Sequence, residues 1–137
     1  MFIKQVSVFV ENKSGKIADI LSVLGENSID ISALSIADTT DFGIIRMIVN
    51  DTEKALSVLK SYGAIAKITD VIGVRVSDTP GGLATALCAL KKSGIELDYI
   101  YAFVGRDEGG ATVVMKVDNP EAALSCLKDN NISVIEG

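Results

Sequence analysis

Two short turns carry the side chains in this chain that could bind a small molecule. Asn12 in the first turn and Asp78 in the second each stand three residues before a glycine, Gly15 or Gly81, that opens an expected helix. The start of a helix presents unpaired backbone N–H groups and the positive end of the helix dipole, which attract a carboxylate. The neighbouring amide or carboxylate can accept a hydrogen bond from an ammonium group, so each turn suits a free amino acid. Helix capping in a tight turn explains the same residues, and on the turn alone it is the simpler interpretation.

The two turns recur because the chain contains an internal repeat. The segment 8–18 matches the segment 74–84 at an offset of 66 residues, and the match resumes at an offset of 68 in the later part of each copy. This period is longer than the units of about 20–50 residues that build solenoids and arrays. We interpret the repeat as duplication of a small domain and predict two domains, over residues 1–70 and 71–137.

The first copy has the pattern of a β-α-β-β-α-β unit. Val6, Val8 and Val10 alternate with other residues as a half-buried strand requires, and apolar residues then recur at helical spacing until Gly25. Residues 51–53 provide the start of a second helix, which Gly63 ends. The remaining expected elements are strands over 29–37 and 42–49, which form a hairpin, and an extended segment over 64–68.

The second copy repeats this order. Its expected strands and helices predict an α+β fold of two ferredoxin-like modules, each an antiparallel four-stranded sheet with two helices on one face. No linker richer than Thr69-Asp70 separates the copies, so we expect the halves to touch. The strands are expected near 72–76, 95–104, 111–117 and 132–135, and the helices near 82–92 and 120–130.

Some strands carry apolar residues on both faces. In the segment 95–104, leucine and aromatic residues lie on one side while Ile100, Ala102 and Val104 lie on the other. A strand with one solvated face alternates with polar residues instead. We infer that the helix-free face or a sheet edge is covered by the other half or by another chain, and we predict a homodimer.

Composition excludes several classes of function. A net charge of −5 argues against a nucleic-acid surface, and the longest uncharged stretch, Thr79–Leu90, is shorter than the roughly 18–20 apolar residues that span a bilayer. The first residues lack the basic and apolar regions of a secretory signal, so a cytoplasmic location is expected. The chain has no histidine, no nucleophile motif and no phosphate-binding loop, and Cys88 and Cys126 stand alone. We predict no metal site, no cofactor, no catalytic residue and no enzymatic activity.

The wider sequence around both turns resembles the ACT domain family. The resemblance rests on the pattern Val-x-x-Asn-x-Ser-Gly-x-x-Ala-x-Ile-Leu-x-x-Leu in the first copy, and on 76–84 followed by 93–97 in the second. It covers nearly the whole chain as a tandem pair. It implies a regulatory module that binds small effectors, usually amino acids, in enzymes such as aspartate kinase and phosphoglycerate dehydrogenase.

The resemblance also implies where an effector would bind, since ACT domains hold it where two modules pair side by side, between a turn of one and strand residues near the interface. The first site would use Asn12, Ser14, Gly15, Lys16 and Ile17 with Asp30, Ile31 and Ser32. The second would use Asp78, Gly81, Gly82 and Leu83 with Glu96, Leu97 and Asp98. Ser14 replaces the usual proline and Lys16 follows the first glycine, so the two sites need not be equivalent. Lys16, Asp30 and Asp98 would contact the effector's charged groups, although each side chain can also simply be solvated.

The sequence thus predicts a non-catalytic module that binds a free amino acid and signals to amino-acid metabolism, with an amino-acid biosynthetic enzyme as a further partner. The alternative is an interaction subunit whose apolar sheet face docks on a partner enzyme without any ligand. The sequence does not name the amino acid or the enzyme.

Overall fold

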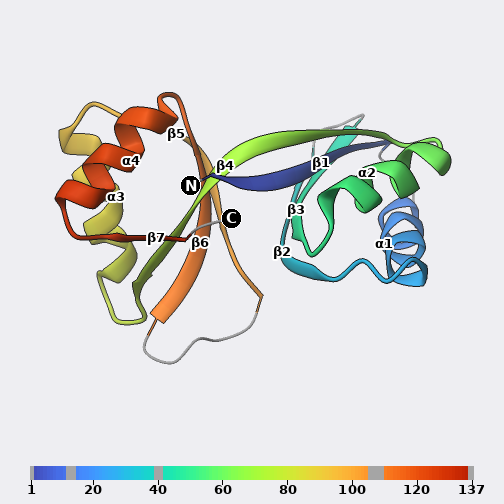
Figure 1. Ribbon diagram of the computed structural model, residues 1–137, viewed down its shortest axis with the longest axis horizontal. Coiled ribbons are helices and arrows are strands. Elements are labelled where there is room, and N and C mark those ends of the chain that lie inside the picture. The colour runs from blue at the N-terminus through green and yellow to red at the C-terminus, as the bar shows by residue number, and fades with distance from the viewer. Residues whose placement is uncertain (1, 12–14, 39–41, 105–109, 136–137) are drawn as a thin grey trace. The chain divides into compact units, whose positions relative to one another are not determined.

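The computed structural model describes residues 2–11, 15–38, 42–104 and 110–135 (Figure 1). Its internal contacts divide the chain into two units. The first unit is Lys4–Thr69, and the second unit is Met1–Ile3 together with Asp70–Gly137. None of the helices in these described ranges is long and apolar enough to cross a membrane.

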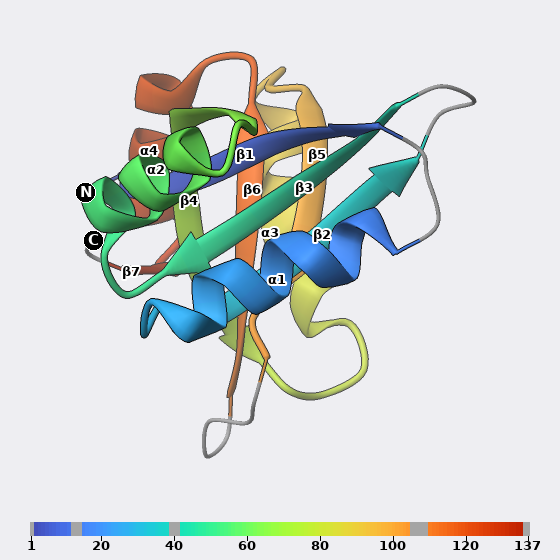
Figure 2. The same ribbon diagram turned by 90° about the vertical axis from the view of Figure 1, so that its right-hand side faces the viewer.

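The first unit forms because its apolar residues fall on one face of each element. Val6, Val8 and Val10 of β1 are buried against Ile20 of α1 and Leu59 of α2 in one core cluster. Among the described residues the strand order is β2-β3-β1-β4, and β3 pairs antiparallel with both β1 and β2. Figure 2 shows α1 and α2 in front of this sheet. The elements are β1 (Ile3–Glu11), α1 (Lys16–Glu26), β2 (Ile31–Asp38), β3 (Phe42–Val49), α2 (Thr52–Ser61) and β4 (Ile65–Ser77).

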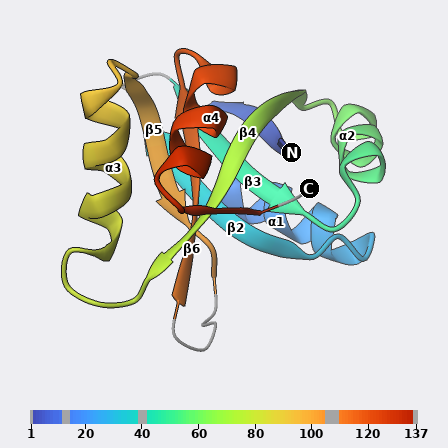
Figure 3. The ribbon, with the colours of Figure 1, turned by 60° about the vertical axis from the view of Figure 1, so that its left-hand side comes forward.

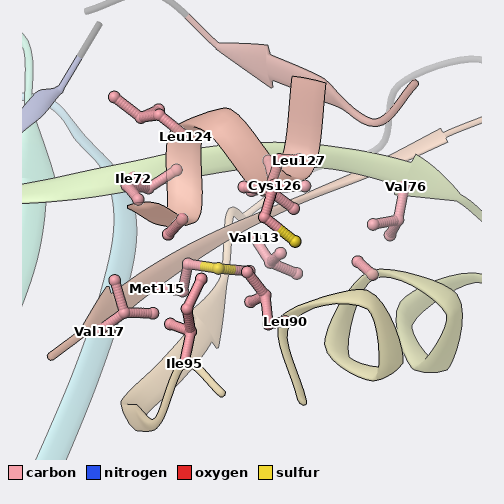
Figure 4. Packing of buried hydrophobic residues seen from close by; sticks show 13 residues of the cluster. Ile72, Val76, Leu90, Ile95, Val113, Met115, Val117, Leu124, Cys126 and Leu127 are labelled. Carbon is pink, nitrogen blue, oxygen red and sulfur yellow. The ribbon is translucent and has the colours of Figure 1, made fainter. Parts of the chain in front are cut away.

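The second unit repeats this plan around a core of its own (Figure 3). The described strands lie in the order β7-β4-β6-β5, and β4 pairs antiparallel with both β6 and β7. Met115 of β6 is fully buried and points toward Leu90 of α3 (Figure 4). The further elements are α3 (Gly82–Lys92), β5 (Leu97–Ala102), β6 (Gly110–Val117), α4 (Pro120–Asp129) and β7 (Ser133–Ile135).

The strand β4 differs from the expected pattern. We expected an extended segment over 64–68, a short linker at Thr69-Asp70 and a separate strand over 72–76, but one strand of 13 residues covers all three. The segment is rich in isoleucine and valine, whose branched side chains favour the extended backbone. Gly73 lies in its middle, where an added Cβ would lie 3.1 Å from the Ile3 side chain and 3.3 Å from the Ile135 side chain on β7. The repeat boundary is therefore inside a strand.

The expected strand over 95–104 is too long at both ends. Ile95 and Glu96 precede β5, and the strand ends at Ala102 after an irregular register between Leu97 and Tyr99. Ile100 packs against the core, while Tyr99 and Tyr101 are half-buried and their rings stack with centroids 6.4 Å apart. The homodimer that we inferred from such two-faced strands stays a prediction.

Replacing Asp51, the capping residue of α2, tests how much this cap contributes to stability. The Asp51 side chain accepts a hydrogen bond from the Lys54 backbone N–H at 3.1 Å, and Asn119 caps α4 in the same way. We expect Asp51→Ala to lower the free energy of unfolding by about 1 kcal/mol, because a first-turn N–H loses its acceptor. Urea unfolding measures this loss. Asp51→Asn keeps an acceptor and should cost much less, so an equal loss in both variants would contradict the cap.

Candidate functional site

Both turns between the first strand and first helix of a unit contain a glycine in the left-handed conformation. Gly15 precedes α1 with φ +81°, and Gly81 precedes α3 with φ +85°. Residues other than glycine are strained at such angles. Both glycines occupy the N-cap position of their helix, but glycine has no side-chain oxygen that could accept from the first N–H groups. A side-chain cap from these two residues therefore does not explain the turns.

The second turn is closed by short local contacts. The Gly82 N–H donates to the Thr79 carbonyl oxygen at 3.0 Å, and the Ser77 and Thr79 hydroxyl oxygens lie 2.8 Å apart. A Cβ added to Gly82 would stand 2.0 Å from the Ser77 carbonyl oxygen, so this close approach requires glycine. Asp78 is exposed beside it. In the first copy the matching position, at the offset of 66, holds Lys16, so the two turns differ in sequence at this point.

A cavity of about 200 Å³ lies beside the first turn. Figure 1 shows the elements that surround it, where the end of β1, the start of α1, the end of α2 and the start of β4 gather at one end of the first unit. Its polar and turn lining is Glu11, Lys16, Tyr62 and Gly63. Its apolar lining is Phe9, Val10, Ile20, Phe42, Ala64 and Ile65.

The turn after α2 brings one wall of this cavity into place. The helix ends at Ser61 with Tyr62 as its C-cap, and Gly63 reverses the chain with φ +88°. The Gly63 N–H donates to the Lys60 carbonyl at 3.0 Å, and the Ala64 N–H donates to the Leu59 carbonyl at 2.9 Å. These bonds set the course of the backbone after Tyr62. The Tyr62 ring lines the cavity, and the Lys16 ammonium lies 5.6 Å from its centroid. This distance permits a cation–π attraction.

Charge and apolar surface meet in the cavity. Lys16 in the first turn of α1 contributes a cation, and Glu11 at the end of β1 contributes a carboxylate. Phe42 is 57% exposed and Ile65 is 70% exposed at its rim. Such a cavity has groups for both ends of a small zwitterion and an apolar surface for the rest of the molecule.

The structure brings together only part of the first predicted site. Lys16 lines the cavity, Gly15 precedes it in the turn, and Ile17 packs against the core. Asn12 and Ser14 lie outside the described residues. Asp30, Ile31 and Ser32 follow the other end of α1, whose eleven residues at about 1.5 Å each span about 16 Å, so these three do not reach the cavity within their own unit.

The second predicted site is divided in the same way. Asp78, Gly81, Gly82 and Leu83 lie at the start of α3, whereas Glu96, Leu97 and Asp98 follow its end. Glu96 and Leu97 line a separate cavity of about 400 Å³ with Leu87, Leu90, Lys91, Gly94 and Ile95. The grouping of this turn with these strand residues, which the resemblance to ACT domains implies, stays a prediction.

Several of the strand residues also have structural contacts. The Asp30 N–H donates to the Asn50 side chain at 2.9 Å, and the Glu96 N–H donates to the Asp118 carboxylate at 3.0 Å. These matching bonds tie the start of one strand to the end of its neighbour in both copies. The Asp98 carboxylate lies 3.8 Å from the Lys116 ammonium in a partly exposed ion pair. Exposed pairs of this kind contribute little stability.

Sequence reasoning missed most of the cavity lining. Glu11, Phe42 and Ile65 come from three different strands, and Tyr62 comes from the end of a helix. A register prediction could have placed Phe42 opposite Glu11, because β1 and β3 pair in that register. No local pattern indicates that the end of α2 lies beside the start of α1.

Comparisons with known proteins agree with this architecture. The sequence matches the ACT domain pair family over residues 1–137. The crystal structure of protein BT0572 from Bacteroides thetaiotaomicron is similar, with a TM-score of 0.91 and 37% sequence identity over 98% of this chain and 92% of that one. The ligand-free regulatory subunit of aspartate kinase from Thermus thermophilus shares the fold, with a TM-score of 0.68 and 18% identity over 92% of this chain and 91% of that one. A search of curated proteins found no match.

These findings confirm two predictions made from the sequence, the ferredoxin-like α+β fold and the resemblance of the repeat to tandem ACT domains. The match extends through both copies and so includes both turns. The chain belongs to the ACT domain pair family.

Proposed function

We propose that this chain is a non-catalytic regulatory module that binds a free amino acid in the cavity beside Gly15. The observation that carries the proposal is the cavity itself, in which one cation and one carboxylate lie beside an apolar wall. Its volume of about 200 Å³ is below the roughly 300–1,000 Å³ typical of pockets for drug-sized ligands. A molecule of amino-acid size matches it better.

The charges of the cavity suit the two ends of an amino acid. The Lys16 ammonium would pair with the ligand carboxylate, and the first N–H groups of α1 add positive potential at the same place. The Glu11 carboxylate would accept from the ligand ammonium. The two groups recognise what all free amino acids share.

Relatives support a role in regulation. The Thermus thermophilus protein that shares this fold is the regulatory subunit of an aspartate kinase. By analogy we propose that this chain, too, signals to an enzyme of amino-acid metabolism, although the analogy rests on the fold alone. The turn at Asp78 is proposed as a second binding turn because it repeats the first in sequence.

Calorimetric titration with the twenty amino acids tests the proposal. We expect at least one to bind with a Kd below about 1 mM, which corresponds to roughly −4 kcal/mol. Lys16→Gln should weaken that binding at least about tenfold, because a charge-assisted hydrogen bond is lost. Lys60→Gln is the matched control, since Lys60 is exposed on α2 and does not line the cavity.

Three outcomes of this titration separate the possibilities. If no amino acid binds below about 1 mM, the proposal fails. If the Lys16→Gln and Lys60→Gln variants bind the amino acid with equal affinity, the effector does not occupy the cavity beside Gly15. Asp78→Ala then tells whether the second turn takes part, because an unchanged affinity would remove that turn from the site.

A second candidate is an interaction subunit that docks on a partner enzyme without a ligand. The observation in its favour is that large apolar side chains are exposed in both units, including Ile36 at 44% and Val104 at 72%. Exposed apolar residues are common on soluble proteins when they are scattered. The absence of any amino-acid binding in the titration would favour this candidate.

A further inference from the structure

The side chains around the first cavity also indicate which kind of amino acid fits it. We infer that the cavity selects an amino acid with a large apolar side chain, such as leucine or phenylalanine, over one with a polar, charged or very small side chain. This inference rests on the proposed function, because it concerns the same cavity and the same class of ligand.

The first argument is the balance of charges in the cavity. Among the described residues, Glu11 and Lys16 are the charged residues of its lining, and in the proposed function both interact with the two ends of a bound amino acid. A ligand with a third charge, on its side chain, would bring that charge against Phe9, Phe42 and Ile65, without a partner in the described part of the lining. A charge or an amide that loses water without gaining a hydrogen bond is strongly disfavoured.

The second argument is the unusual exposure of the apolar lining. Phe9 is 38% exposed, Phe42 57% and Ile65 70%, and the Tyr62 ring beside them is 39% exposed. Single exposed apolar residues are ordinary, but these four line one small cavity. An apolar ligand side chain would remove part of this surface from water, which is the main driving force for binding apolar groups.

The third argument is the depth of the cavity beyond its rim. Val10 and Ile20 form part of its lining and belong to the buried core of the first unit, with exposures of 4% and 1%. The inner lining of the cavity is therefore apolar as well. A glycine or alanine ligand would leave the exposed apolar rim uncovered, and a missing methylene in an apolar pocket weakens recognition about 10- to 200-fold.

Titration with leucine and asparagine tests the inference, because the two side chains are similar in shape but differ in polarity. We expect leucine to bind at least about tenfold more tightly than asparagine, and alanine to bind more weakly than leucine by a similar factor. The variant Ile65→Thr keeps a β-branched side chain but makes the rim polar. It should reduce the preference for leucine over asparagine at least about threefold.

Ile36→Thr is the matched control, because Ile36 is also an exposed isoleucine on a strand and does not line the cavity. A tenfold preference for leucine that Ile65→Thr reduces and Ile36→Thr does not would support the inference. Binding without this preference, or with equal effects of the two variants, would overturn it and leave the proposed function standing. Binding of no amino acid at all would overturn both.

Discussion

Replacing Gly82 with alanine is expected to lower the free energy of unfolding by about 1–3 kcal/mol, the usual cost of forcing extra atoms into a packed site. The new Cβ would stand 2.0 Å from the Ser77 carbonyl oxygen. That oxygen belongs to the backbone at the end of β4, so it cannot rotate away as the tip of a side chain would. Either the turn before α3 or the end of the strand must shift. Urea unfolding followed by circular dichroism measures the loss.

Gly25→Ala is the control for this prediction. Gly25 is exposed in α1, and apart from the adjacent residues and the backbone of its own helix no atom lies within 4 Å of the position that its Cβ would take. Alanine is favoured over glycine in a helix by about 0.5–1 kcal/mol, so this variant should be slightly more stable than the parent. If Gly82→Ala unfolded at the same urea concentration as the parent, the close approach at Ser77 would be wrong.

Leu24→Ala is expected to cost more, about 2–5 kcal/mol, as leucine-to-alanine changes in packed cores do. Leu24 is fully buried in the core of the first unit, where α1 meets the sheet. Truncating it removes apolar contacts and leaves a cavity that the neighbouring side chains fill only in part. The same urea unfolding experiment measures this loss.

Two further variants provide comparisons for the result at Leu24, one at the surface of the same helix and one in the core of the second unit. Ser22 lies on the exposed side of the same helix, so Ser22→Ala should change the free energy of unfolding by no more than about 0.5 kcal/mol. Leu90 holds the matching position in α3, is 2% exposed, and should give a loss similar to that at Leu24 when replaced by alanine. A loss below 1 kcal/mol at Leu24 would show that α1 is not packed as the structure has it.

The parts of the fold that local sequence encodes were predictable. The strand Phe42–Val49 and the helix Gly82–Lys92 have the predicted bounds, since a turn or a glycine marks each start. Asp51 marked the start of α2 because its side chain can cap only a helix that begins directly after it. Because the second copy repeats the first, an element assigned in one copy could also be assigned at the matching position in the other.

The continuity of β4 was not predictable in the same way. Thr69 and Asp70 are polar, and polar residues between two apolar segments commonly indicate a turn. Here strand pairing overrides that local preference, because β4 lies beside β1 and then pairs with β6 and β7. Pairing between distant segments leaves little trace in the local sequence.

The candidate site was predictable only at its turn. Lys16 was identified from the sequence because it interrupts a motif that the second copy retains. Tyr62 and Ile65 reach the cavity because α2 ends beside the start of α1, which depends on how the helices pack on the sheet. The grouping of each turn with strand residues near a module interface remains a proposal that the resemblance to ACT domains supports.

The single strand β4 has a practical consequence for work on the two copies. Tandem domains are commonly joined by an exposed linker that tolerates cleavage or insertion, because few backbone hydrogen bonds cross it. At residues 69–70 of this chain, a protease site or a reporter insertion would interrupt a strand of 13 residues instead. Expressing the halves separately would likewise leave each with a severed strand end. Although the gene reads as a duplication, its halves cannot be separated at their own boundary without breaking a β-strand.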